Sequence, residues 1–187
     1  ICQYRQDLYE KRRTRTSGTE WFYFQSWYEV PVKNRMLSGV YFYTTGYDGV
    51  FPYVYTHIID DPYNDFDGQP GEKDLNTTYP SKNGPVPTLQ WEALREGFDD
   101  LRHIELLEEL LSRPVPTGPK GPAVEKVKQR GKALLERIRK TTGWEGPTFD
   151  RKTMREQHLL PINTLDGFRR ELQQVIMDFD RAATPTA

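Results

Sequence analysis

The sequence predicts an α/β fold in which two strands belong to a parallel sheet and helices cover that sheet. Three observations support this prediction. An aromatic-rich run covers residues 21–28, an alternating run covers residues 49–57, and a helical stripe of apolar residues covers residues 88–111. This order is typical of a parallel α/β unit, because parallel strands need a long crossover that is usually a helix.

The composition indicates one globular core. The 187 residues are 36% hydrophobic and 13% aromatic, but they are fewer than the roughly 250 residues of a complete (β/α)8 barrel. A net charge of −1 argues against nucleic-acid binding, and the absence of an apolar run near 20 residues argues against a membrane span. The lone Cys2 indicates neither a disulfide nor a zinc site. We therefore expect a soluble chain without a cofactor, in a compartment that the sequence leaves open.

The first predicted strand covers residues 21–28 and is apolar on both faces, which is typical of a strand buried in a parallel sheet. Pro31 then begins a helix that continues to Thr45, at a position where proline loses no hydrogen bond. Gly39 in this helix permits close packing, and Gly46 ends it.

The second predicted strand covers residues 49–57, although Pro52 disfavours a central position in the sheet. Its period of two places Phe51, Tyr53, Tyr55 and His57 on one face. The segment from there to Gly84 is longer than an ordinary connection. Loops beyond about 12–15 residues are usually functional or disordered.

The third element is a long helix that begins after Thr88, whose hydroxyl can cap the first turn. On its outer face Arg95 and Asp99 are four residues apart and can form a weak ion pair. The residues predicted to form its buried stripe recur at steps of three and four: Trp91, Leu94, Phe98, Leu101, Ile104, Leu107 or Glu108, and Leu111.

Beyond residue 111 the chain changes in composition. Residues 112–122 form a linker of proline and glycine, which no helix or strand would cross. Two helices follow it. The first ends near Gly143 and has a basic face, which we interpret as solvated. The second begins at Asn163. The predicted buried stripes are Val124, Val127, Gly131, Leu134 and Ile138 in the first helix, and Leu165, Phe168, Leu172, Val175 and Phe179 in the second.

Several motifs together resemble a known family. They are Gly84-Pro-Val-Pro-Thr-Leu-Gln-Trp-Glu-Ala-Leu-Arg-Glu-Gly-Phe-Asp-Asp-Leu-Arg102, the preceding Tyr79-Pro80, and Tyr47-Asp-Gly-Val-Phe-Pro-Tyr-Val-Tyr55. This region is similar to the C-terminal part of the glycoside hydrolase family 123 catalytic domain and to its relatives called domain of unknown function 4091. Gln90 and Trp91 depart from the family pattern, which puts the substrate in doubt.

The resemblance implies the C-terminal portion of a (β/α)8 TIM-like barrel over residues 1–111, the linker over 112–122, and a helical extension over 123–187. It implies a glycosidase for N-acetylgalactosaminides, in which an adjacent Asp-Glu pair assists the acetamido group of the substrate. This sequence contains no Asp-Glu dipeptide. We therefore assign it no catalytic residue. We expect a fragment whose partners are a glycan and the remaining barrel strands, which leaves open whether this chain is itself an enzyme.

We expect the fragment to form one wall of the sugar site. Loops that leave the C-terminal ends of barrel strands form the active site, and aromatic rings with polar groups suit a sugar. The predicted contacts are Trp27, Tyr55, His57, Asp61 and Asp65. A calcium loop that includes Asp65 and Asp67 is a weaker alternative, because Tyr63 occupies the place of its first ligand.

Two other functions remain open at this stage. The chain could be a carbohydrate-binding module without catalysis, which would use the same aromatic residues. It could also be a structural module whose C-terminal helices dock on a partner, as the basic helix suggests.

Overall fold

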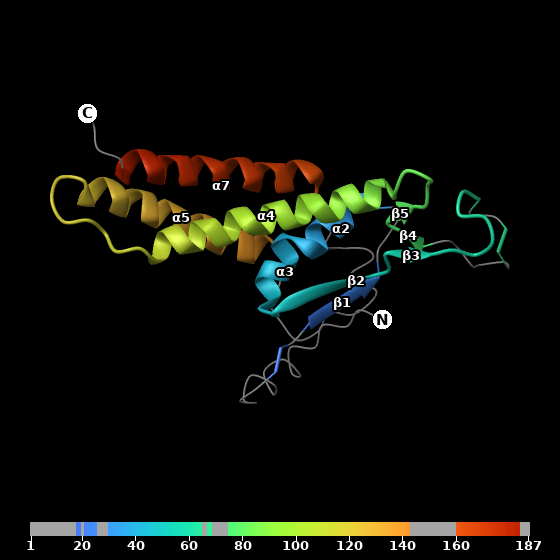
Figure 1. The fold of residues 1–187 in the computed structure, drawn as a ribbon. Helices are drawn as coiled ribbons and strands as arrows, with labels where there is room; N and C mark the ends of the chain where they lie inside the picture. Colours follow the sequence, from blue (N-terminus) through green and yellow to red (C-terminus); the bar gives the residue numbers. More distant parts are fainter. Residues whose placement is uncertain are drawn as a thin grey trace.

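Two parallel strands form the main sheet: β1 (Trp21–Gln25) and β2 (Gly49–Tyr53) (Figure 1). The computed structural model describes residues 18–19, 21–25, 30–64, 67–68, 75–142 and 160–183. Trp21 lies opposite Gly49 in the register. A Cβ atom on Gly49 would lie 2.6 Å from the indole of Trp21, so a larger residue there would force this exposed ring to shift.

Two short helices, α2 (Pro31–Ser38) and α3 (Val40–Thr45), connect the strands. The sequence predicted one continuous helix. Gly39 interrupts it with φ −112° and ψ −110°, and a Cβ atom there would lie 2.8 Å from the carbonyl oxygen of Gly97. The close packing expected at Gly39 is therefore confirmed. Gly46 ends α3 in the left-handed region with φ 69°, also as predicted.

The long helix α4 (Leu89–Ser112) packs across α2 and begins where the sequence predicted. The hydroxyl oxygen of Thr88 accepts hydrogen bonds from the N–H groups of Gln90 and Trp91, at 3.2 and 3.3 Å. The residues that α4 buries are Gln90, Ala93, Leu94, Gly97, Asp100, Ile104, Leu107 and Leu110. The buried stripe is therefore rotated from the predicted one.

Among the described elements, the helices cover one face of the β1–β2 sheet. Phe24 and Val50 are buried on that face, whereas Trp21, Tyr23 and Phe51 are exposed on the other by 59%, 36% and 56%. The expectation of a strand buried on both faces is thus not met in the described residues. Among the described elements, no helix packs over the second face, where aromatic rings contact one another. The rings of Tyr23 and Phe51 stack with centroids 6.3 Å apart.

The predicted strand 49–57 is interrupted. β2 ends at Tyr53, the peptide bond from Tyr53 to Val54 is cis, and a separate strand β3 (Thr56–His57) follows. β3 pairs antiparallel with β4 (Leu75–Asn76), and β5 (Thr78–Tyr79) pairs antiparallel with β6 (Val86–Pro87). The interval that the sequence predicted as a loop therefore contains β4 and β5, each of which is only two residues long and so leaves no periodic pattern.

Beyond α4 the chain forms two further helices, α5 (Gly121–Thr141) and α7 (Ile162–Ala183), and both pack beside α4 (Figure 1). α5 runs back antiparallel to α4, and α7 lies along both. Every residue of the two predicted stripes is buried. One continuous cluster of apolar side chains extends from Phe24 in β1 to Phe179 in α7.

Ion pairs buried under α7 join the helices. Arg35 in α2 bonds to Asp100 in α4 through two nitrogens, at 2.7 and 3.2 Å, and to Asp166 in α7 at 2.6 Å. Arg169 in α7 bonds to the same Asp100 at 2.6 Å and also pairs with Glu96. Burial would lower the pKa of the Arg35 guanidinium, but the two aspartates outweigh burial and raise it. None of these pairs was predicted.

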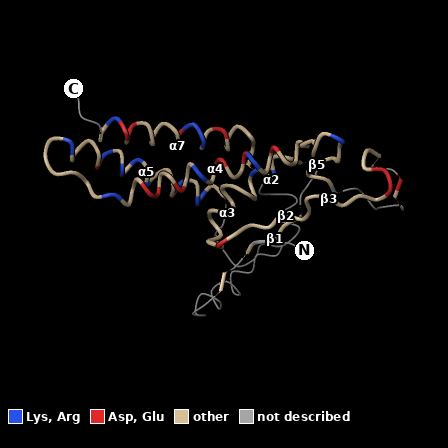
Figure 2. The backbone as a smooth tube through the Cα atoms, viewed as in Figure 1, with Lys and Arg blue, Asp and Glu red and all other residues tan. Residues whose placement is uncertain are grey.

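Charged side chains are interspersed along α4, α5 and α7, whereas β1 and the body of β2 carry none in the described part (Figure 2). The predicted solvated face of α5 is only partly correct. Lys128 is buried, and its Nζ donates to the carbonyl oxygens of Leu111 and Arg113 at the end of α4. Arg130 pairs with Asp178 of α7 at 2.8 Å.

The structure therefore confirms a mixed fold of helices and small sheets, compatible with the predicted α/β class. Two main strands, their cover helices and two further helices are present. The described residues do not close a barrel, because β1 and β2 pair only with each other among them. No helix in the described part is long and apolar enough to cross a membrane.

Candidate functional site

The candidate site lies beyond the C-terminal ends of β1 and β2. Both strands run toward the ladders β3–β4 and β5–β6 (Figure 1). Parallel strands bring the residues that follow them to one edge of a sheet, which is where α/β proteins usually place their ligands. Three of the predicted sugar contacts, Tyr55, His57 and Asp61, follow β2 within eight residues on this side.

Tyr55 connects β2 to β3, and its side chain is 53% exposed. Its carbonyl oxygen accepts two hydrogen bonds from Thr77, one from the N–H at 3.0 Å and one from the Oγ1 hydroxyl at 2.7 Å. The phenol ring meets the indole of Trp91 edge to face, with centroids 6.1 Å apart and planes at 83°. Tyr55 is thus held from both its backbone and its ring.

Trp91 was predicted to be buried, and that prediction is wrong, because its side chain is 40% exposed. The buried face of α4 passes through Ala93 and Gly97 instead. Gly97 lies so close to α2 that a Cβ atom on it would be 2.1 Å from Ser38 Oγ. This contact turns Trp91 away from α2 and toward Tyr55. A glycine at the centre of a helix was the signal for such a rotation.

His57 lies in β3, opposite Leu75 of β4, and its side chain is exposed. Asp61 is also exposed, but it has a local structural role. Its Oδ1 accepts the N–H of Tyr63 at 3.0 Å, and its own N–H donates to Asp67 Oδ2 at 2.7 Å. Asp61 and Asp67 therefore stabilise a turn here.

A second aromatic pair stabilises the same region. The rings of Tyr63 and Tyr79 stack with centroids 5.4 Å apart and planes at 23°, and the Tyr63 hydroxyl donates to the carbonyl oxygen of Pro80. This pair was not predicted from the sequence. Two of the predicted contacts, Trp27 and Asp65, lie outside the described residues.

One side chain in this region has unused hydrogen-bonding capacity. Asn76 in β4 is 7% exposed, and neither its Oδ1 nor its Nδ2 has a hydrogen-bond partner. Its neighbours in the chain are well bonded, since Thr77 donates to Tyr55 and accepts the N–H of Thr88 at 3.1 Å. Among the described residues, the buried carboxamide of Asn76 is therefore an unpaired polar group beside a well hydrogen-bonded backbone.

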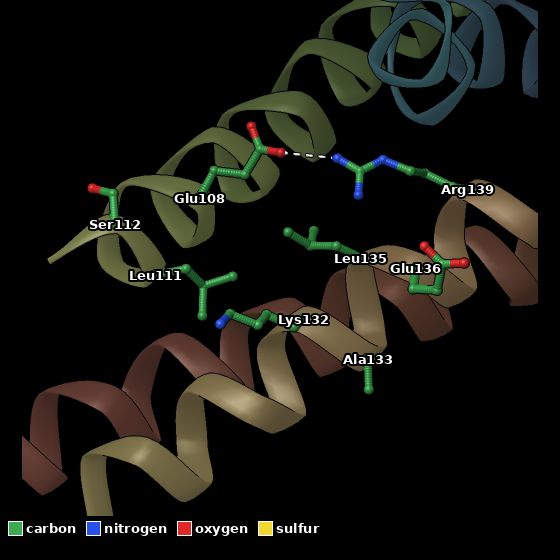
Figure 3. Close-up of a pocket in the computed structure, with 8 residues that line it drawn as sticks. All are labelled: Glu108, Leu111, Ser112, Lys132, Ala133, Leu135, Glu136 and Arg139. Carbon is green, nitrogen blue, oxygen red and sulfur yellow. Dashed lines mark hydrogen bonds and ion pairs between the residues drawn. The ribbon is translucent and has the colours of Figure 1, made fainter. Parts of the chain in front are cut away.

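A groove of about 690 Å³ lies elsewhere, between the end of α4 and α5 (Figure 3). Arg139 reaches across it to Glu108 at 3.2 Å, and the hydroxyl of Tyr43 donates to the same carboxylate at 2.7 Å. Burial and this acceptor raise the pKa of Tyr43 above its ordinary value of 10.0. The polar groups satisfy one another, so they hold α3, α4 and α5 together. The groove contains none of the predicted sugar contacts.

The described residues contain no group of three His, Cys, Asp or Glu side chains that could hold a metal ion. Asp65, which the alternative calcium loop would include, lies outside them. What this side of the sheet offers is exposed aromatic rings with hydroxyl, imidazole and carboxylate groups. That combination can stack on the C–H face of a sugar and bond to its hydroxyls.

Comparison with known proteins gives one match. The family model described as Glycoside hydrolase 123, catalytic domain, matches residues 3–107, which include β1, β2, the antiparallel ladders and most of α4. No curated protein and no solved structure matches the chain.

Proposed function

The chain belongs to the family of glycoside hydrolase 123 catalytic domains, and on this premise we propose that it forms one wall of the sugar site in a glycoside hydrolase. The observation that carries the proposal is the family match over residues 3–107, taken with the position of Tyr55, His57 and Asp61 beyond the C-terminal end of β2. A sugar on this wall would stack on an aromatic ring and bond to the polar groups beside it.

We also propose that further strands pair with β1 and β2 and complete a barrel. A two-stranded parallel sheet is seldom stable alone, and parallel sheets are normally covered on both faces. The exposed rings of Trp21, Tyr23 and Phe51 lie on the face opposite the helices, which is the face that a (β/α)8 barrel encloses. Further strands pairing with β1 and β2 would cover these rings and extend the edge on which the site is built.

The catalytic carboxylates would come from those further strands. In the described part of the chain the deeply buried carboxylate is Asp100, and its oxygens bond to Arg35 and Arg169. Its side chain is only 3% exposed, so a substrate could not reach it. The exposed carboxylate of Asp61 accepts the N–H of Tyr63 within a local turn. We therefore assign bond cleavage to residues of the further strands.

We further propose that the domain boundary lies after α4. The family match ends at residue 107, near the end of that helix at Ser112. Residues 1–111 would then be the glycosidase-like part, 112–122 a connection, and 123–187 a helical extension. α5 and α7 would act as a brace, since their apolar stripes and the ion pairs of Arg169 rest on α4.

The substrate that we propose is an N-acetylated amino sugar, following the family to which the chain belongs. The test is hydrolysis of nitrophenyl N-acetylgalactosaminide and N-acetylglucosaminide by the full-length protein. Asp61→Asn removes the charge but keeps the Oδ1 that accepts the N–H of Tyr63. We expect this variant and His57→Gln to lower kcat/KM by about tenfold or more, as expected for the loss of a hydrogen bond to substrate.

The matched control is Asp60→Asn, the adjacent carboxylate, whose backbone has φ 57°, a conformation that asparagine tolerates. It should leave kcat/KM within about twofold. An equal loss in Asp60→Asn and Asp61→Asn would show that only the charge of the loop matters. Sugar binding without hydrolysis by a folded full-length protein would contradict the glycosidase hypothesis and support a carbohydrate-binding module.

A further inference from the structure

The rings of Tyr55 and Trp91 stand at 83° to each other and are exposed by 53% and 40%. They come from segments 36 positions apart, the end of β2 and the first turn of α4. We propose that these two rings form an aromatic corner that binds one pyranose ring of the substrate. This inference rests on the proposed function, because it names a binding residue, Trp91, at the same sugar site.

The chemistry of a pyranose fits such a corner. One side of the sugar carries C–H bonds and is apolar, while its rim carries hydroxyl groups. The C–H face can stack on one ring as the edge of the sugar contacts the other, so that the corner fixes orientation as well as position. Two large aromatic side chains left partly in water carry apolar surface that a ligand can cover.

The corner is held in place before any ligand binds. Two hydrogen bonds from Thr77 fix the carbonyl of Tyr55, at 3.0 and 2.7 Å. The N–H of Thr88 donates to the carbonyl oxygen of Thr77 at 3.1 Å, and the hydroxyl of Thr88 caps the N–H of Trp91 at 3.3 Å. A chain of hydrogen bonds therefore joins the backbones of the two aromatic residues. Such preorganisation lowers the entropy that binding would lose.

The position of Trp91 limits what it can do. It lies at the start of α4, on the outer part of the wall, and it has no group that could donate or accept a proton in catalysis. A residue that stacks equally on the substrate and the transition state changes KM and leaves kcat nearly unchanged. A purely structural Trp91, needed only to hold Tyr55, would instead change stability and the fraction of folded enzyme.

The experiment compares Trp91→Ala, Trp91→Phe and the control Leu89→Ala in the full-length protein. Leu89 is 74% exposed in the same helical turn but lies about 200° around the helix from Trp91. The readouts are kcat and KM on a nitrophenyl glycoside that the enzyme hydrolyses, saturation-transfer NMR with the free sugar, and the thermal midpoint. We expect Trp91→Ala to raise KM about tenfold, with kcat within about twofold.

Trp91→Phe keeps an aromatic face and should keep KM within about threefold, and Leu89→Ala should match the parent protein. An unchanged KM and an unchanged NMR signal in a folded Trp91→Ala variant would overturn the proposal that the aromatic corner binds the sugar. That result would not affect the proposal that the protein is a glycosidase. A parent that hydrolyses no glycoside would overturn the proposed function. In that case an NMR signal lost only in Trp91→Ala would still support the corner, and no sugar signal in the parent would overturn both.

Discussion

Arg35 in α2 and Asp100 in α4 form a two-point ion pair, with Nε to Oδ2 at 2.7 Å and Nη2 to Oδ1 at 3.2 Å. The side chains are 6% and 3% exposed. Arg169 of α7 adds a further bond to Asp100, so one carboxylate connects three helices. The bonds from Arg169 to Asp100 and from Arg35 to Asp166 hold α7 against the part of the chain that the family model matches, and Asp100 gives the most direct test of the packing.

We predict that Asp100→Asn destabilises the protein by about 3 kcal/mol, the lower end of the range for a broken buried ion pair, because Arg35 keeps Asp166 and Arg169 keeps Glu96 as acidic partners. Urea unfolding followed by circular dichroism measures the change. The control is Asp99→Asn, whose carboxylate is 29% exposed and pairs with Arg95 and Arg102. Removing such a partly exposed pair should cost about 1 kcal/mol or less. Equal losses in the two variants would contradict the buried role of Asp100.

We predict that Gly97→Ala destabilises the protein by about 1–3 kcal/mol through overpacking. A Cβ atom at 97 would lie 2.1 Å from Ser38 Oγ and 2.5 Å from the carbonyl oxygen of Arg35. The same substitution at Gly167 in α7 meets no atom within 4 Å. Alanine favours the helix there, so Gly167→Ala should stabilise by about 0.5–1 kcal/mol. Thermal unfolding of both variants measures the opposite signs, and a stabilising Gly97→Ala would show that α2 and α4 are less closely packed.

Asn76→Leu should leave the free energy of unfolding unchanged or raise it. The carboxamide of Asn76 is buried without a partner, and leucine has a similar size but no polar group to desolvate. The adjacent Thr77→Val provides the contrast, because it removes the hydroxyl that donates to Tyr55. That loss should cost about 1 kcal/mol. A clear destabilisation by Asn76→Leu would show that the carboxamide binds a water molecule or another group in solution.

The stability of the protein should depend on Tyr43 at alkaline pH. Burial, followed by the hydrogen bond to Glu108, raises the pKa of this hydroxyl above 10.0. The folded state therefore keeps its proton after the unfolded state has lost it, and the unfolded state is favoured increasingly as pH rises from about 10. The stability due to Tyr43 is fully present below pH 10 and is lost as pH rises from there through the raised pKa.

The measurement is the difference in thermal midpoint between the parent and Tyr43→Phe from pH 7 to pH 11. We expect a constant difference up to about pH 9.5 and a decrease above pH 10, since phenylalanine has no proton to lose. A difference that increases with pH would mean that the hydroxyl ionises more readily in the folded state, contrary to its contact with Glu108.

Much of the secondary structure could be predicted because its signals are local. Thr88 caps α4 through its own hydroxyl, Gly46 ends α3 in the left-handed region, and the stripes of α5 and α7 repeat within each helix. The candidate site was predicted less completely. Tyr55, His57 and Asp61 lie on the expected side of the sheet, but whether they contact a sugar stays a prediction. Trp91 was placed in the core.

Local sequence is therefore sufficient for the helices, for the parallel pair β1–β2 and for the family motifs, because each depends on residues within a few turns or on a crossover of ordinary length. Contacts between segments distant in sequence determine the buried ion pairs and the orientation of Trp91. Asp100 is buried because Arg35 and Arg169 lie 65 and 69 positions away in the chain and meet it. Trp91 is turned outward because Gly97 fits against α2, and Tyr55 meets it because Thr77 bonds both to Tyr55 and to Thr88 at the start of α4. A pattern that repeats along one helix cannot say which neighbour covers it, so these features follow only from how the helices pack.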